Sequence, residues 1–170
     1  VTVANDFREV GIVKDPFNFG TTTISSASTR RQSYAIKMAS APSTPYEIDE
    51  KITQSTTGAV GKVVEWDATN NILYYQQEQY TNYGIAAYGN CISFTGANTI
   101  TGDTSGAATT PSATGSENVT LAGGTVLAFT SGYANPELEP NSGHILYVEN
   151  RRPISRASDQ TEDIKIVVEF

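Results

Sequence analysis

Apolar and polar residues alternate along many short stretches of this chain, and alternation with a period of two is typical of β-strands that bury one face. The clearest stretch is the last one, where Ile164, Ile166, Val168 and Phe170 occupy every second position. This pattern predicts a final strand whose apolar face, and with it the C-terminus, is held inside the fold. The other stretches that predict strands are residues 7–13, 32–38, 46–52, 63–66, 72–75, 91–94, 119–121, 126–129 and 145–149.

Two pairs of these stretches are separated by turn residues, which predicts β-hairpins. The first hairpin joins residues 63–66 to residues 72–75 through the loop Asp67–Asn71. The second hairpin has the pair Gly123-Gly124 as its turn. No strong amphipathic helix is predicted, although the serine-rich lead-in to the second strand also allows a short helix.

We therefore predict a mainly β fold with little helix, in which an antiparallel sheet or sandwich core carries an inserted small β-barrel-like subdomain. Two prolines in residues 40–45 mark the first internal boundary. Residues 1–43 and 113–170 are then the two parts of the core β domain, and residues 44–112 are the insertion. The Thr-, Ser- and Gly-rich residues 95–116 predict a long, flexible return segment, because they bury too little apolar surface to offset the entropy lost on ordering.

Composition limits the function classes. Eighteen acidic against eleven basic residues give a net charge of −7, which argues against binding to the phosphates of a nucleic acid. The single cysteine, Cys91, excludes a disulfide framework and a multi-cysteine zinc site. There is no apolar run long enough to span a membrane, so we expect a soluble protein. The chain begins at Val1 without a methionine, and we expect it to be part of a longer polypeptide.

Few residues have the spacing of a catalytic or phosphate-binding motif. His144 is the only histidine, and its place at the start of a strand is better explained as a partly exposed residue than as a general base. Residues 58–62 resemble a phosphate loop, but the glycine spacing is too short and Val63 stands where Ser or Thr must bind magnesium. We predict no catalytic residue, no cofactor and no small-molecule substrate.

An acidic cluster of Asp159, Glu162 and Asp163 has the oxygen ligands that a hard cation prefers. A solvated turn, in which Asp159 or Thr161 accepts backbone hydrogen bonds, explains the same residues, and we predict no metal site. Paired carboxylates for glycoside hydrolysis are not singled out by spacing, because such partners need only meet in space.

Tyrosines and arginines provide the candidate interface residues. The tyrosine-rich residues 74–88 contain Tyr80 and Tyr83, which fit a sugar-stacking platform or, more commonly in such a segment, a half-buried sheet or a protein interface. Arg151 and Arg152 suit bidentate pairing with carboxylates, either within the fold or across a subunit boundary. A surface network of little energetic consequence is the alternative for the arginines.

Two blocks near the C-terminus resemble a known family: residues 142–154, which read SGHILYVENRRPI, and residues 159–164, which read DQTEDI. Together with FREVGIVKDP at residues 7–16 and the approach at residues 135–137, they are similar to the C-terminal part of the baseplate wedge protein made by gene eight of T-even-like contractile-tailed phages. The long β-rich stretch between these blocks departs from the family, so no function for the insertion follows. The residues that carry the resemblance are Phe7, Arg8, Pro16, Gly143, Tyr147, Glu149, Asn150, Arg151, Pro153, Asp159, Gln160, Thr161, Glu162, Ile164 and Phe170.

The resemblance implies a non-enzymatic virion protein: a wedge subunit of the tail baseplate, assembled in the host cytoplasm. It further implies a homodimer that contacts other baseplate wedge proteins, with no nucleic-acid or membrane partner. We expect residues 6–14, 145–149 and 163–170 to form a rigid scaffold sheet. The alternatives are a carbohydrate- or receptor-binding module of a phage tail, with Tyr80 and Tyr83 facing the host, and a tail-associated glycosidase or peptidase.

Overall fold

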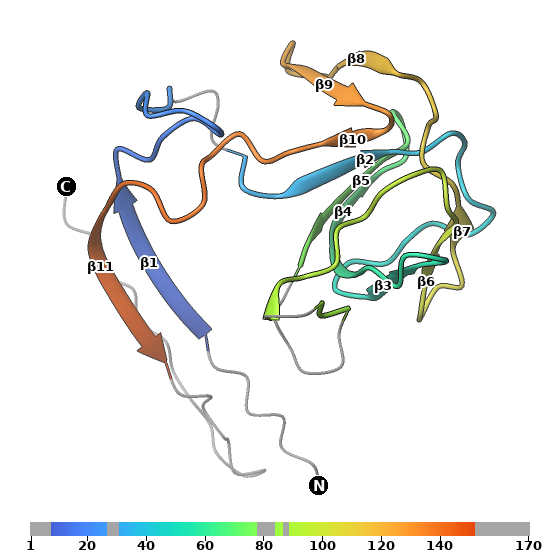
Figure 1. Ribbon diagram of the computed structural model, residues 1–170, viewed down its shortest axis with the longest axis horizontal. Helices are drawn as coiled ribbons and strands as arrows, with labels where there is room; N and C mark the ends of the chain where they lie inside the picture. Colours follow the sequence, from blue (N-terminus) through green and yellow to red (C-terminus); the bar gives the residue numbers. More distant parts are fainter. Residues whose placement is uncertain (1–7, 27–30, 78–83, 87–88, 152–170) are drawn as a thin grey trace, which may run out of the picture.

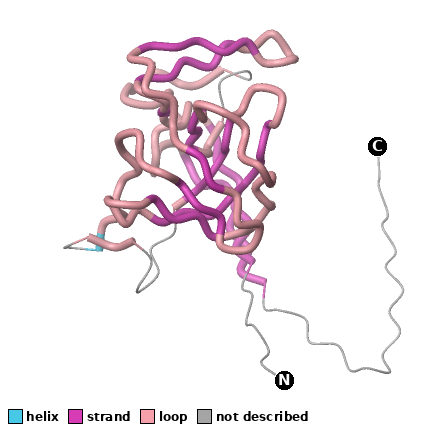
Figure 2. Tube along the Cα trace, turned by 90° about the vertical axis from the view of Figure 1, so that its right-hand side faces the viewer, coloured by secondary structure: helices cyan, strands magenta, loops and turns pink. Residues whose placement is uncertain are grey.

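The computed structural model describes residues 8–26, 31–77, 84–86 and 89–151 (Figures 1 and 2). This part of the chain contains eleven β-strands and no α-helix, and every strand pair is antiparallel. The predicted fold class, mainly β with antiparallel sheets and little helix, is confirmed.

The strands form two sheets. β1 (Arg8–Lys14) and β11 (His144–Arg151) make a two-stranded ribbon, which lies beside the rest of the molecule in Figure 1. The other nine strands form one sheet in the order β7-β6-β3-β4-β5-β2-β10-β9-β8. Their bounds are β2 Tyr34–Lys37, β3 Lys51–Gln54, β4 Val60–Asp67, β5 Ile72–Gln76, β6 Ile100–Gly102, β7 Ala108–Thr109, β8 Ser116–Thr120, β9 Val126–Thr130 and β10 Tyr133–Ala134.

Both predicted hairpins are present. β4 pairs with β5, and the carboxylate of Asp67 accepts hydrogen bonds from the backbone N–H of Thr69 (2.9 Å) and Asn70 (3.1 Å), which holds the turn between the two strands. β8 pairs with β9 across a turn in which Gly124 has a φ of 80°. A positive φ favours glycine, so the two-glycine turn rule identifies this hairpin for the right reason.

The nine-stranded sheet curls into part of a barrel. The segment after β7 bonds to the segment after β2: Met38 forms a β-bridge with Pro111, and the N–H of Ser112 donates to the carbonyl of Lys37 (2.8 Å). The curled sheet encloses the larger apolar core. Its buried members are Ile36, Met38, Tyr46, Ile52, Ala59, Val63, Leu73, Tyr75, Phe94, Ile100 and Ala107.

A second, smaller core lies on the other face of the sheet. It contains Ala35, Ile72 and Tyr74 together with Leu127 and Phe129 of β9. Successive residues of a strand point to opposite faces, so β2 and β5 are buried on both faces. The sequence predicts only one dry face for residues 32–38. That prediction is wrong because the β8–β9 hairpin, at the top of Figures 1 and 2, provides apolar side chains for the second face.

The polar residues 95–116 hold more structure than their composition predicts. They contain β6 and β7, and the side chains of Ile100 and Ala107 are fully buried in the larger core. A few well-spaced apolar residues are therefore enough to anchor this segment.

β2, β3 and β8 join one hydrogen-bonded sheet although they come from three different parts of the predicted domain division, and that division stays a prediction.

Two predicted strands are shorter than expected. β3 begins only at Lys51, and Ile48 is 69% exposed, because residues 47–50 form a turn. Of residues 91–94, Cys91 forms an isolated bridge with Ile85, while Phe94 packs edge-on against Tyr75 with ring centroids 4.7 Å apart. Phe94 therefore reaches the core from a loop.

Buried Gln54, at the end of β3, ties the loop of residues 95–98 to the sheet. Its Oε1 accepts hydrogen bonds from the backbone N–H of Thr95 (2.9 Å) and the hydroxyl of Thr57 (2.8 Å). Its Nε2 donates to the hydroxyl of Tyr133 (2.9 Å), which donates in turn to the carbonyl of Gly96 (2.7 Å). Because the amide has partners for both its oxygen and its nitrogen, its complete burial is tolerated.

Candidate protein-interaction surface

The β1–β11 ribbon carries the largest group of exposed apolar side chains in the described part of the chain. Four consecutive residues of β11 are between 48% and 70% exposed, and two of β1 are 44% and 54% exposed. Soluble proteins rarely expose contiguous apolar patches of this kind unless another surface covers them. The ribbon patch consists of Ile12, Val13, Ile145, Leu146, Tyr147 and Val148.

The register assigns these side chains to two faces. Ile12 lies opposite Tyr147, so their side chains share the outer face of the ribbon. Gly11 lies opposite Val148, and this pair belongs to the other face because side chains alternate along a strand. A bulge between Ile12 and Val13 shifts the register at this point. Each face of the ribbon therefore carries apolar side chains.

A groove of about 670 Å³ lies between the ribbon and the rest of the molecule. Val13 and Ile145 line it from the ribbon, and Tyr34 and Leu138 line it from the opposite side. Pro16, Pro136 and Pro140 contribute further to its wall. The face of the ribbon that carries Gly11 is thus the groove face, and the face with Ile12 and Tyr147 is the outer face.

A short pair of segments fastens the ribbon to the molecule. The N–H of Phe19 donates to the carbonyl of Glu137 (2.8 Å), and the N–H of Glu139 donates to the carbonyl of Phe17 (2.9 Å). The N–H of Phe17 also donates to the Oγ of Ser142 (2.9 Å). Side-chain and backbone bonds thus hold the start of β11 and the end of β1 at one corner.

Gly143 stands at that corner, and the structure explains why the family motif has glycine there. Its φ is 85°, and a Cβ atom would lie 2.7 Å from the carbonyl oxygen of Lys14. Any side chain at this position would therefore force the two strands apart. Pro16, another motif residue, is buried beside it.

The structure places the remaining sequence-predicted residues in two groups. Tyr147 is exposed and Glu149 is half-buried on β11, while Arg8 pairs in register with Arg151 and Asn150 pairs with Glu9. The side chains of these last four residues are not described. The predicted residues outside the described ranges are Phe7, Tyr80, Tyr83, Arg152, Pro153, Asp159, Gln160, Thr161, Glu162, Ile164 and Phe170.

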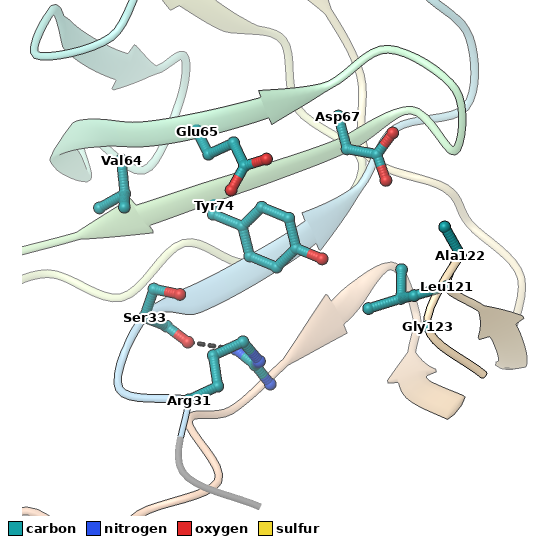
Figure 3. Close-up of a pocket in the computed structure, with 9 residues that line it drawn as sticks. All are labelled: Arg31, Ser33, Val64, Glu65, Asp67, Tyr74, Leu121, Ala122 and Gly123. Atoms are coloured by element: carbon teal, nitrogen blue, oxygen red, sulfur yellow. Dashed lines mark hydrogen bonds between the residues drawn. The ribbon is translucent and has the colours of Figure 1, made fainter. Parts of the chain in front are cut away.

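A second pocket, of about 420 Å³, lies between the β4–β5 hairpin and the β8–β9 turn (Figure 3). Arg31 lies at one side of it and donates to the carbonyls of Ser33 and Asn135. Burial lowers the pKa of the Arg31 guanidinium, and the carboxylate of Glu137 opposes this change. Because the donors of Arg31 already bond to protein carbonyls, its first role is to fix the lead-in to β2.

Tyr74 occupies the middle of this pocket in Figure 3, with Glu65 close by. Burial raises the pKa of the Tyr74 phenol; the charge of Arg31 lowers it, and the carboxylates of Asp67 and Glu65 raise it. The ring of Tyr74 belongs to the smaller core and its side chain is almost fully buried, and the same is true of Tyr75 in the larger core. These two tyrosines therefore do not form a sugar-stacking platform.

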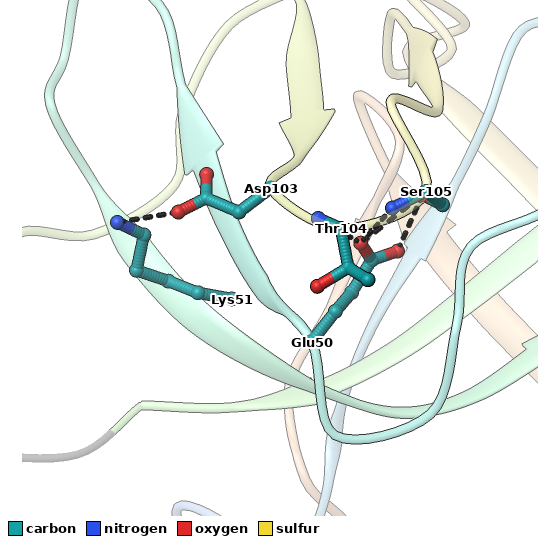
Figure 4. Close-up of polar contacts among 5 residues, drawn as sticks. All are labelled: Glu50, Lys51, Asp103, Thr104 and Ser105. Carbon is teal, nitrogen blue, oxygen red and sulfur yellow. Dashed lines mark hydrogen bonds and ion pairs between the residues drawn. The ribbon is translucent and has the colours of Figure 1, made fainter.

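Glu50 is a buried carboxylate with a structural role (Figure 4). Its Oε1 accepts a hydrogen bond from the N–H of Glu47 (2.7 Å), and its Oε2 accepts from the N–H groups of Thr104 (3.1 Å) and Ser105 (3.0 Å). The hydroxyl of Ser105 donates to the same carboxylate (2.8 Å to Oε1). Glu50 thus joins the turn before β3 to the turn between β6 and β7.

These bonds determine the acidity of Glu50. Burial alone raises the pKa of its carboxyl group, but the hydrogen bonds from Ser105, Glu47 and Thr104 together lower it more, and the pKa lies below its ordinary value. The neighbouring ion pair of Lys51 and Asp103 (2.6 Å) is half exposed and contributes little. Nothing in the sequence around Glu50 identified it, since its partners Thr104 and Ser105 come from a segment more than fifty residues away.

The remaining chemical candidates do not come together. His144 is exposed at the start of β11 and lies opposite Lys14. Among the described residues, no three His, Cys, Asp or Glu side chains are grouped so as to hold a metal ion. The same part of the chain has no helix with the length and apolar character that a membrane crossing requires.

Comparison with known proteins identifies a family. A family model described as "Bacteriophage T4, Gp8" matches residues 58–170, which is more than half of the chain and includes β11 and most of the curled sheet. No curated protein matches the chain, and neither does any solved structure.

Proposed function

Because the chain belongs to the Gp8 family of bacteriophage T4, we propose that this phage baseplate structural protein joins its neighbours in the wedge through the β1–β11 ribbon. The observation that carries the proposal is the ribbon patch: contiguous exposed apolar side chains on two paired strands, with Ile12 and Tyr147 on the outer face and the others reaching the groove face. Burying apolar surface stabilises a contact by about 25 cal/mol per Å², so a patch of this kind favours permanent association.

The proposed role is mechanical and not catalytic. The two cores and the bonds of Gln54 and Glu50 hold the curled sheet as one rigid body, and the corner at Gly143 fixes the ribbon to it. A rigid body with a preformed apolar surface loses little conformational entropy on docking, which is what a repeated structural unit of a virion requires. Its partners are other baseplate wedge proteins, and a second copy of the chain in a homodimer.

The test compares two substitutions of equal exposure. Ile12 on the ribbon and Val126 on β9 are 54% and 55% exposed, so Ile12→Glu and Val126→Glu introduce the same charge at similarly exposed strand positions. We expect both variants to fold with a stability within about 0.5 kcal/mol of the parent, as is usual for surface changes. We expect only Ile12→Glu to abolish co-purification with the other wedge proteins of the phage, because it places a charge in an apolar contact.

Circular dichroism melting curves serve as the folding control for both variants. Retained co-purification by a folded Ile12→Glu variant would remove the ribbon from the assembly surface. Equal loss by both variants would point to a general effect of added negative charge on a protein that already has a net charge of −7.

A further inference from the structure

The groove between the ribbon and the rest of the molecule has apolar walls that the described part of the chain leaves open. Ile145 lines it from β11 and is 70% exposed, and Val13 lines it from β1 and is 44% exposed. On the opposite wall Tyr34 is half-buried and Leu138 is almost fully buried. Two large apolar side chains beside a concave apolar wall are unfavourable in water, so an occupant of the groove gains free energy by covering them.

The bulge in the ribbon turns Ile145 toward the groove. Tyr147 pairs with Ile12 and Ile145 pairs with Val13, so Leu146 is the extra residue on β11. In a regular strand Ile145 would share the outer face with Tyr147, because side chains two positions apart lie on one face. The extra residue places Ile145 on the groove face with Val13 instead. Because bulges commonly re-aim a side chain next to a functional position, this one indicates a binding surface.

We propose that the groove binds an extended segment of a neighbouring wedge protein, and that this segment carries apolar side chains and at least one lysine or arginine. The volume of about 670 Å³ favours an extended chain, because two turns of a helix, about 11 Å long and about 10–12 Å across, need more space. This inference rests on the proposed function and names the kind of partner that the groove face of the ribbon receives.

The groove is rigid before anything binds. Three of its lining residues, Pro16, Pro136 and Pro140, have a φ fixed by the proline ring. Ser142 also lines it, and the hydroxyl of Ser142 accepts from the N–H of Phe17 (2.9 Å) and donates to the carbonyl of Glu139 (2.7 Å). A rigid groove loses little conformational entropy on binding, which favours recognition of a flexible, extended segment.

Charge complementarity specifies a basic segment. Among the thirteen described residues that line the groove, Glu139 is the only charged one. The N–H of Gly20 donates to Oε2 of Glu139 (2.6 Å), which fixes the carboxylate in place. A carboxylate accepts up to about four hydrogen bonds, so Glu139 keeps the capacity to bind a lysine or arginine. The net charge of −7 attracts a basic segment as well.

The test measures binding of the full chain to short overlapping peptides that cover the other baseplate wedge proteins of the phage and this chain itself. We expect a peptide from another wedge protein, with apolar residues and a lysine or arginine, to bind, and its affinity to fall as salt is added. Ile145→Ser should weaken this binding roughly tenfold or more, because the isoleucine is no longer there to be buried.

The matched control is Ile48→Ser, which removes the same side chain at 69% exposure from a position that does not line the groove. We expect this variant to bind the peptide as the parent does. Glu139→Gln tests the charge, since the amide oxygen still accepts from the N–H of Gly20. The affinity of Glu139→Gln for the peptide should be several-fold lower and less dependent on salt. Circular dichroism melting curves check that all three variants fold.

Three results would overturn the inference: no peptide binds, Ile145→Ser and Ile48→Ser bind the peptide equally well, or only peptides of this chain bind. The last result would assign the groove to a segment of the same chain or to a second copy. If no peptide binds while wedge proteins co-purify with the parent and not with Ile12→Glu, the proposed function stands and the groove does not have this role.

Discussion

Replacing Glu50 by glutamine tests whether one buried carboxylate holds two distant turns together. The two oxygens of Glu50 accept hydrogen bonds from three backbone N–H groups and the hydroxyl of Ser105. Glutamine keeps the shape but replaces one oxygen with an NH₂ group, which donates and does not accept. Whichever way the amide turns, at least one of the N–H groups of Glu47, Thr104 and Ser105 loses its acceptor.

The expected loss of stability follows from the number of hydrogen bonds that Glu50→Gln removes. A hydrogen bond to a charged group contributes about 1.5–3 kcal/mol, and a buried donor left without a partner costs a similar amount. We therefore expect Glu50→Gln to lower the free energy of unfolding by about 1.5–3 kcal/mol at pH 7. For a chain of this size that corresponds to a decrease of roughly 3–12 °C in Tm.

The pH dependence of the stability gives a second test of the role of the Glu50 carboxylate. The pKa of Glu50 is below its ordinary value in the folded protein, so its carboxylate contributes stability that is present above the ordinary pKa. This contribution is lost as the pH falls through the lower, folded-state pKa, because the unfolded chain takes up the proton first. We expect the stability difference between the parent and Glu50→Gln to be largest at neutral pH and to shrink as the solution is made acidic.

The assay is urea denaturation followed by circular dichroism between neutral and acidic pH. The matched control is Glu65→Gln, which removes the same charge from an exposed side chain. If Glu50→Gln and Glu65→Gln have the same stability at pH 7, or if the effect of Glu50→Gln is independent of pH, the carboxylate does not hold these turns.

Two further predictions concern the same turn and the interface. Gly102→Ala places a Cβ about 2.5 Å from Oε1 of Glu50 and pushes the carboxylate away from its donors, so the loss of stability should be smaller when this change is added to Glu50→Gln than when it is made alone. Gly115→Ala, whose Cβ would meet nothing within 4 Å, is the control. If the stability losses of Gly102→Ala and Glu50→Gln add up fully in the double variant, the two positions do not interact. Arg151→Glu and Arg152→Glu should leave folding intact and weaken wedge assembly if these side chains act across a subunit boundary; unchanged assembly with a lower Tm would place them within the fold.

Local patterns in the sequence predicted the strands and hairpins well. The turn residues of Asp67–Asn71 and the pair Gly123-Gly124 identified both hairpins, because turn chemistry is decided within a few residues. The pairing of residues 6–14 with 145–149 was also expected, and β1 and β11 do pair. The third member of that expected sheet, residues 163–170, lies outside the described residues.

Long-range contacts explain what the patterns missed. Composition predicted a flexible segment at residues 95–116, but Ile100 and Ala107 reach the larger core, and Thr104 and Ser105 bond to Glu50. Similarly, one dry face was predicted for β2, yet the distant β8–β9 hairpin covers the other. Such partners are chosen by the folded arrangement and leave no mark on the local sequence.

The sequence alone determined the β class, the hairpins and the membership in a phage baseplate family, because each of these depends on residues close together in the chain or on a continuous motif. Only the tertiary structure decided which apolar strands are buried and which are exposed. Alternation shows that a strand has an apolar face, but whether another sheet covers this face depends on where the rest of the chain packs. For β2 that cover comes from the β8–β9 hairpin, whereas the apolar side chains of the β1–β11 ribbon stay exposed within the described part of the chain.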